Sequence, residues 1–166
     1  MIQPSKVESA AEKKEDENWR FRTFLKNHAD VDELDEHFFA LHNELFNGYD
    51  CSKCRNCCRS YNAELRDDEI GPIAATLGLS KEDFIAQRLT KSEGKYSIES
   101  PCCFLDGDGG CSIEENRPKT CKEFPFTNKP GRLWHLIGTV TYAEQCPVVF
   151  EMLERLKAIY HFKPRR

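Results

Sequence analysis

The sequence predicts a small, helix-rich α+β domain with an irregular, cysteine-rich middle. Apolar residues recur at helical spacing on both sides of that middle, and a short hairpin pattern, "CCFLDGDGGCSI", lies within it. At 166 residues the chain is long enough for one modest core. We expect a polar, disordered lead over residues 1–17, N-terminal helices over 18–48 and a cysteine-cluster domain over 49–162.

The clearest helical pattern before the middle is "DVDELDEHFFALHNELFNG". Leu34, Phe38, Leu41 and Leu45 recur at i, i+4, i+7 and i+11, acidic residues fill the first turn, and Gly48 follows as a natural stop. The preceding "NWRFRTFLKN" predicts a shorter amphipathic helix. Together they account for the predicted N-terminal helices.

Two further helices are expected after the first cysteines. "RDDEIGPIAATLG" predicts a helix that begins at Asp67 or Asp68 and ends before Gly78. "LSKEDFIAQRL" predicts another, with Ser80 as its N-cap and Asp83 three residues later.

The rest of the chain alternates between short elements and loops. We expect a polar connection over 91–100 with a short strand at "KYSI", and one helical turn entered at Pro118. "RLWHLIGTVTY" is rich in β-forming residues and predicts a strand. "PVVFEMLERLKAIYHF" predicts a closing amphipathic helix through Val149, Leu153 and Leu156.

Composition argues against several classes of protein. The net charge of −4 gives no general attraction to nucleic acid or to anionic membrane. No apolar run approaches the roughly 20 residues needed to span a bilayer. The N-terminal residues lack the apolar segment of a secretory signal. We therefore expect a cytoplasmic protein with no membrane or nucleic-acid partner, in a compartment that disfavours stable disulfides.

Against that background, cysteine is far too abundant for packing alone. The chain has nine: Cys51, Cys54, Cys57, Cys58, Cys102, Cys103, Cys111, Cys121 and Cys146. The number is odd, so a full set of intramolecular disulfides would leave one thiol unpaired.

The spacing "CSKCRNCC" indicates metal ligands. Two residues between cysteines let both sulfurs turn inward on one tight loop, so Cys51, Cys54 and Cys57 are plausible ligands. Cys58 is expected to point elsewhere, where it reaches a second metal or bridges two. Pairs within such a loop rarely reach relaxed disulfide geometry, so disulfides and plain buried thiols remain weaker alternatives. We expect this irregular region to lack a core of its own, so that a metal fixes it and removal of the metal unfolds residues 51–146.

The later cysteines supply a second set of candidate ligands. Cys102 and Cys111 flank the predicted hairpin, Cys121 follows "RPKT", and Cys146 precedes a proline, which leaves Cys103 over. Thiolate centres carry negative charge, which nearby cations would offset. Six basic residues within four positions of a cysteine are candidates, although an ordinary solvated face is an equal alternative: Lys53, Arg55, Arg59, Arg117, Lys119 and Lys122.

"CSKCRNCC", "PCCFLDGDGGCSIEENRPKTCKEFPF" and the late "CP" together resemble the CxxCxxCC cysteine-cluster family, a zinc- or iron-chelating domain related to flagellin lysine N-methylase. The resemblance covers about residues 49–150. It implies eight metal ligands: Cys51, Cys54, Cys57, Cys58, Cys102, Cys111, Cys121 and Cys146. The chain departs from the family pattern at Cys103, where proline is usual, and at Glu114, where tyrosine is common.

The metal and its role stay open at this point. The Cys51–Cys54–Cys57 spacing resembles the first ligands of a bacterial ferredoxin, which slightly favours an iron–sulfur cluster or iron over zinc. The first hypothesis is a metal-binding protein whose metal is at least structural. Alternatives are an iron–sulfur-dependent redox or protein-lysine methyl-transfer enzyme, and a protein of metal sequestration or delivery. The sequence has no glycine-rich loop after a strand of the kind that binds S-adenosylmethionine.

Overall fold

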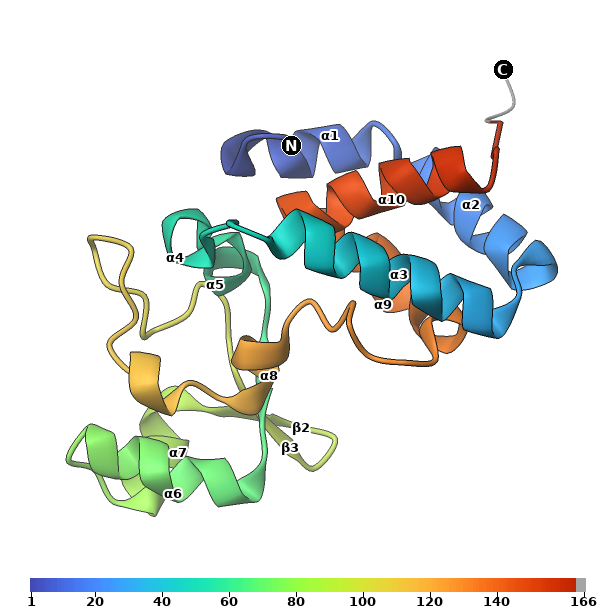
Figure 1. Cartoon of the computed structure of the whole chain (residues 1–166). Helices are drawn as coiled ribbons and strands as arrows, with labels where there is room; N and C mark the ends of the chain where they lie inside the picture. Colours follow the sequence, from blue (N-terminus) through green and yellow to red (C-terminus); the bar gives the residue numbers. More distant parts are fainter. Residues whose placement is uncertain (164–166) are drawn as a thin grey trace. The chain divides into compact units, whose positions relative to one another are not determined.

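The structure is a computed structural model, and it describes residues 1–163. The described residues form two compact units (Figure 1), one containing Met1–Asp50 and residues 125–163, the other containing Cys51–Phe124. The α+β class is confirmed, since most residues are helical and one small antiparallel sheet is present. The division differs from the expected cysteine-cluster domain over 49–162, because residues after 124 belong with the N-terminal helices. Within residues 1–163, no helix combines the length and the apolar character needed to cross a membrane.

The first unit is helical. Its elements are η1 (Pro4–Lys6), α1 (Val7–Glu12), α2 (Glu15–His28), α3 (Val31–Phe46), η3 (Arg132–His135), α9 (Leu136–Tyr142) and α10 (Pro147–Ile159). Helix α3 packs against α10 and η3, and α2 packs against α9. The predicted apolar stripe of α3 is buried, and the Asp30 side chain caps this helix by accepting the N–H groups of Asp32 and Glu33.

Two segments of this unit differ from expectation. Residues 1–17, expected to be disordered, contain η1, α1 and the start of α2, because Val7 and Ala11 lie one turn apart and are both buried. The segment 132–142, expected to be a strand, forms η3 and α9. Its β-forming residues are outweighed by a helical repeat of buried Leu136, Val140 and Ala143.

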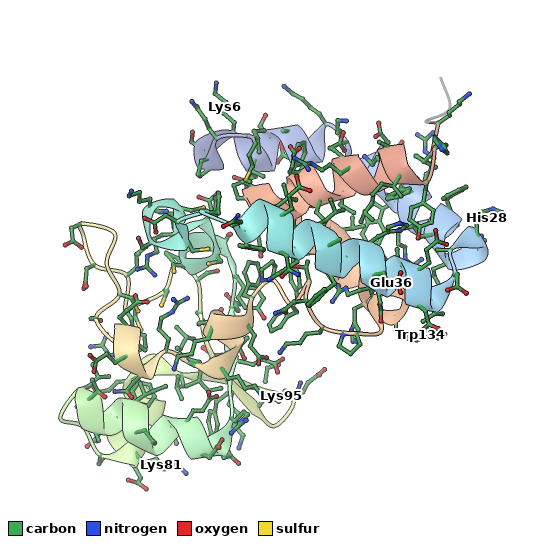
Figure 2. All side chains as sticks on the ribbon, viewed as in Figure 1. Lys6, His28, Glu36, Lys81, Lys95 and Trp134 are labelled. Carbon is green, nitrogen blue, oxygen red and sulfur yellow. The ribbon has the colours of Figure 1, made fainter. Side chains whose placement is uncertain are left out.

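The second unit combines short helices with the sheet. Its elements are α4 (Cys51–Cys54), α5 (Asn56–Ser60), β1 (Ala63–Leu65), α6 (Asp67–Thr76), α7 (Lys81–Arg88), β2 (Thr90–Ser92), β3 (Lys95–Ile98), η2 (Glu114–Asn116) and α8 (Lys119–Glu123). The strand order is β1-β3-β2, all antiparallel. Glu93 and Gly94 join β2 to β3 with φ of 51° and 82°, as a two-residue type I′ hairpin requires. The exposed Lys95 then begins β3 (Figure 2).

The predicted helix boundaries in this unit are confirmed. Helix α6 begins at Asp67 and is followed by Gly78 at φ 68°, and Ser80 caps α7 by accepting the N–H of Asp83. The single helical turn after Pro118 is α8. The hairpin expected at "CCFLDGDGGCSI" is reduced to one bridge between Leu105 and Cys111, and the longer hairpin is β2–β3.

The cysteine-rich unit has a hydrophobic core of its own. Eight buried side chains form it, from β1, α6, α7, β3 and the loops that follow: Leu65, Ile70, Ile73, Ala74, Phe84, Ile98, Phe104 and Ile113. Cys102 and Cys111 pack against this cluster. The expectation that the middle of the chain lacks a core is therefore wrong, and a metal is not the only source of order there.

Candidate metal centre

Five cysteines line one small cavity of about 30 Å³ in the second unit: Cys57, Cys58, Cys102, Cys111 and Cys121. Its other walls are largely apolar and include Tyr61, Phe104 and Phe124. The space suits a metal ion or one or two water molecules. All nine cysteines lie among the described residues, and none of them is in a disulfide.

The turn between α4 and α5 presents two of these sulfurs to the cavity. Arg55 joins the two helices in the left-handed region at φ 52°, and its backbone N–H donates to the carbonyl of Cys51 over 3.1 Å. Helix α5 then begins and carries Cys57 and Cys58. The N–H of Cys102 donates to the Cys58 carbonyl over 2.8 Å, which ties α5 to the loop that brings the later cysteines.

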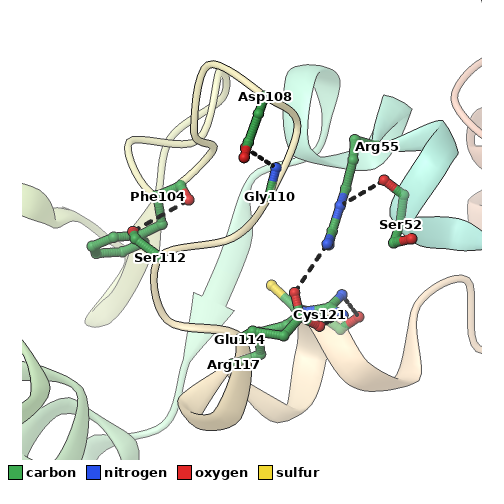
Figure 3. A network of polar contacts seen from close by, with 9 residues as sticks. All are labelled: Ser52, Arg55, Phe104, Asp108, Gly110, Ser112, Glu114, Arg117 and Cys121. Carbon is green, nitrogen blue, oxygen red and sulfur yellow. Dashed lines mark hydrogen bonds and ion pairs between the residues drawn. The ribbon is translucent and has the colours of Figure 1, made fainter.

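A buried arginine sits beside the sulfurs. Only 6% of Arg55 is exposed, and its guanidinium donates to the Ser52 carbonyl over 3.2 Å and to Glu114 over 3.0 Å (Figure 3). Arg117 donates to the other carboxylate oxygen of Glu114 over 3.1 Å and to the Cys121 carbonyl over 3.0 Å. One carboxylate thus holds two guanidinium groups next to the cavity.

These groups act on the thiols electrostatically. The hydrogen bond from Cys57 and the charges of Arg55 and Arg117 lower the pKa of Cys58 to about 6, against the opposing effect of burial. Burial raises the pKa of Cys121 to about 12, and it also raises the pKa of Cys102 and of Cys111. Cys58 therefore ionises before Cys102, Cys111 and Cys121.

The same hydrogen-bond network changes the pKa of Glu114. Burial raises its pKa, but the hydrogen bonds from Arg55 and Arg117 outweigh that effect and the pKa of Glu114 is lowered overall. Sequence reasoning identified Glu114 only as a departure from the family pattern. Its ion pair with Arg117 could have been predicted from their separation of three residues. Its ion pair with Arg55 could not, because it depends on the fold.

The remaining predicted ligands lie outside the cavity. Cys51 is exposed and Cys54 half-buried on α4; Cys103, which was not a predicted ligand, is exposed and also lies outside the cavity. Cys146, 8% exposed, precedes α10 in the first unit. Cys58 was expected to point away from Cys57, but the two lie in the same cavity and are hydrogen-bonded to each other. In the described part of the chain, no three His, Cys, Asp or Glu side chains are arranged to hold a metal ion as they stand.

The predicted basic residues divide into two groups. Arg55 and Arg117 adjoin the cavity cysteines, as described. Three others make contacts along the neighbouring helices: Arg59 donates to the Cys54 carbonyl, Lys122 to the Glu115 carbonyl, and Lys119 pairs with Glu123 at 3.8 Å. Arg55 and Arg117 therefore match the expected role of offsetting thiolate charge, and for Lys53 that role stays a prediction.

The donor set fits a thiophilic metal. Sulfur ligands, apolar walls and adjacent guanidinium groups are the surroundings that zinc and iron–sulfur sites use. A family model, CxxCxxCC, described as "Putative zinc- or iron-chelating domain", matches residues 50–147. Searches of curated proteins and of solved structures give no match.

Proposed function

The chain belongs to the CxxCxxCC family of zinc- or iron-chelating domains, and we propose that it binds its metal through the cysteines of the α5 cavity. The observation that carries the proposal is the convergence of five sulfurs on one largely apolar cavity beside Arg55 and Arg117. The family resemblance alone adds Cys51, Cys54 and Cys146 to the proposed set of eight. That set is large enough for one polynuclear centre or two neighbouring ones.

The charges of Arg55 and Arg117 favour ionisation of a thiol in the cavity before the metal binds. Thiolates, not thiols, are the ligands, so metal binding must release protons. Cys58, with its lowered pKa, supplies the first thiolate near neutral pH, and Cys121, with its raised pKa, gives up its proton only in exchange for the metal. A bound cation would offset the thiolate charge and cross-link α5 to the loops that carry Cys102, Cys111 and Cys121.

The proposed metal is iron, alone or in an iron–sulfur cluster, with zinc as the close alternative. Both accept thiolate sulfur, so the donor set alone admits either. The CxxCxxC spacing supports iron because it resembles the first three ligands of a ferredoxin. The structural role of the metal is local: the core around Phe84 is made by side chains, whereas α4, α5 and the loop before α8 contribute few buried residues.

Metal and acid-labile sulfide analysis of anaerobically purified protein tests the proposal. We expect at least one equivalent of iron or zinc per chain, with sulfide present if the centre is a cluster. Cys58→Ser and Cys121→Ser should each reduce the bound metal strongly. Cys103→Ser is the matched control, since Cys103 is exposed and lies outside the cavity, and it should keep the wild-type metal content.

Two results would contradict the proposal. One is a protein that neither retains metal nor rebinds it after reduction of its thiols. The other is a Cys103→Ser variant that loses as much metal as Cys58→Ser, since the cavity would then have no special role.

Metal delivery is a second candidate function, favoured by the exposure of Cys51 next to the cavity helix. A cysteine accessible to solvent gives an acceptor thiol a place to begin ligand exchange. Delivery predicts that a thiol chelator removes the metal within minutes, and that Cys51→Ser slows this removal at least about fivefold. If wild type and Cys51→Ser lose metal equally slowly, delivery is contradicted and only the structural role of the metal is left.

A further inference from the structure

A second cavity, of about 410 Å³, lies in the first unit, within the residues from Phe126 to Tyr142. Its size falls within the range of small-molecule sites. Three aromatic side chains line it, from Phe126, Trp134 and Tyr142, and the rings of Phe126 and Tyr142 lie 6.1 Å apart. Trp134, labelled in Figure 2, is 71% exposed, which is unusual for so large an apolar side chain.

The polar groups of the cavity are cationic or neutral. Lys129, Arg132 and His135 line it, and within residues 1–163 no carboxylate does. Arg132 is 2% exposed, and its two terminal nitrogens donate to the Phe126 carbonyl and to Thr139 Oγ1, each over 2.7 Å. Its Nε has no hydrogen-bond partner anywhere in the described chain. A buried guanidinium nitrogen without a protein partner is costly, so the protein satisfies the Arg132 side chain only in part.

The charge of Arg132 is only partly balanced by the protein. Burial lowers its pKa, and the nearby Asp35 acts in the opposite direction. The Asp35 carboxylate is, however, engaged by backbone, since it accepts the N–H groups of Gly131 and Arg132 over 2.6 and 2.7 Å. In the part of the chain that the structure describes, Arg132 forms no ion pair, and its guanidinium stacks over the Phe38 ring at 5.0 Å.

The backbone of the cavity is also unusual. Phe126 has φ 61°, in the left-handed region that a bulky residue rarely adopts, and the Arg132 hydrogen bond to its carbonyl holds it there. Gly138 lies within α9, where glycine costs helix stability relative to alanine. A Cβ at this position would stand 3.3 Å from the Tyr142 ring, so glycine lets that ring pack closely and keep the cavity open.

We propose that this cavity binds a small organic anion that carries an aromatic ring, such as an arylacetate. The carboxylate is attracted by Lys129 and by the charge of Arg132, while the ring stacks among Trp134, Phe126 and Tyr142. This site does not depend on the metal proposal, because all of its residues belong to the first unit and the sulfur cavity belongs to the second.

Three probes separate the recognition of charge from that of the ring. Phenylacetate carries both features, phenylacetamide keeps the ring and loses the charge, and acetate keeps the charge and loses the ring. We expect phenylacetate to shift the NMR signals of the Trp134 indole N–H and the Gly138 amide, with a dissociation constant on the order of 1 mM. Phenylacetamide and acetate should each bind at least about tenfold more weakly, because the first loses the attraction to the cationic lining and the second loses the stacking.

Arg132→Gln removes the hydrogen bonds from the guanidinium to the Phe126 carbonyl and to Thr139. Lost binding in this variant would therefore not distinguish a lost ligand contact from a loss of folding. Gly138→Ala is the sharper test, and Gly71→Ala in α6 is its matched control, since a Cβ at Gly71 meets nothing within 4 Å. Both changes favour helix, but only Gly138→Ala should weaken phenylacetate binding, by at least about fivefold. Equal affinity for phenylacetate and phenylacetamide, no binding at about 10 mM, or equal effects of the two alanine variants would overturn the proposal.

Discussion

The ionisation of Cys58 in the metal-free protein offers a direct test of how the cavity works. Its pKa is lowered to about 6 from an ordinary value of 9.0, and the largest cause is the hydrogen bond from Cys57. At pH 7 a thiol with that pKa is about 90% thiolate, against about 1% for an ordinary one. Cys57→Ala removes the bond, and we expect it to raise the pKa of Cys58 by at least about one unit.

The same shift carries a prediction for stability. A thiol whose pKa is lower in the folded state stabilises the fold above the unfolded value, near pH 9. The contribution is lost as the pH falls toward 6. Three units correspond to about 4 kcal/mol, which we reduce to about 2 kcal/mol because Cys58 is only half-buried. In Cys57→Ala, stability should depend less steeply on pH across this window.

The assay is alkylation of metal-free protein by iodoacetamide over pH 5–10, with the product at Cys58 quantified by peptide mass spectrometry. Wild type should show a midpoint near pH 6, and Cys57→Ala a higher one. Cys103→Ala is the control and should leave the midpoint unchanged. A wild-type midpoint near 9, or a midpoint that Cys57→Ala does not move, would refute the hydrogen-bonded pair as the cause.

Three further predictions concern the metal-free fold and the two units. Removing the metal should raise amide hydrogen exchange in α4, α5 and the loop before α8, while the amides of α6 and α7 keep their protection. A uniform loss of protection across residues 51–124 would show that the core does not stay folded without the metal. Phe84→Ala should lower the free energy of unfolding by about 3–5 kcal/mol in a urea titration, whereas exposed Phe39→Ala should change it little; equal effects would count against the assigned core. Asp35→Asn weakens the two bonds to the backbone at Gly131 and Arg132, so we expect a loss of about 1–3 kcal/mol by thermal unfolding, and an unchanged midpoint would disprove that anchor.

Much of the helical framework could be predicted because its signals are local. The stripe from Leu34 to Leu45 and the Ser80 cap follow from residue spacing within a few turns, and the structure confirms both. The strand predicted for residues 132–142 was wrong because the deciding signal is not local. Its β-branched residues favour a strand locally, and only the burial of Leu136 and Val140 on one face decides for helix.

The sequence predicts which side chains supply sulfur to the candidate site, but it does not predict how they are arranged in space. The cysteine spacing identifies the sulfur donors, and the structure brings five of them to one cavity. The role of Arg55 depends on a left-handed turn and on Glu114, 59 residues away, and no sequence pattern encodes that contact. The buried core of the second unit was likewise hidden, because Phe84, Phe104 and Ile113 come from separate short segments.

X-ray absorption at the metal edge of the purified, metal-loaded protein tests the central claim most directly. Thiolate ligation predicts a first shell of sulfur at about 2.3 Å, and Cys58→Ser and Cys121→Ser should reduce either the sulfur count or the metal content. A first shell made mainly of nitrogen or oxygen, or a spectrum that neither variant changes, would contradict the assignment of the metal to the α5 cavity.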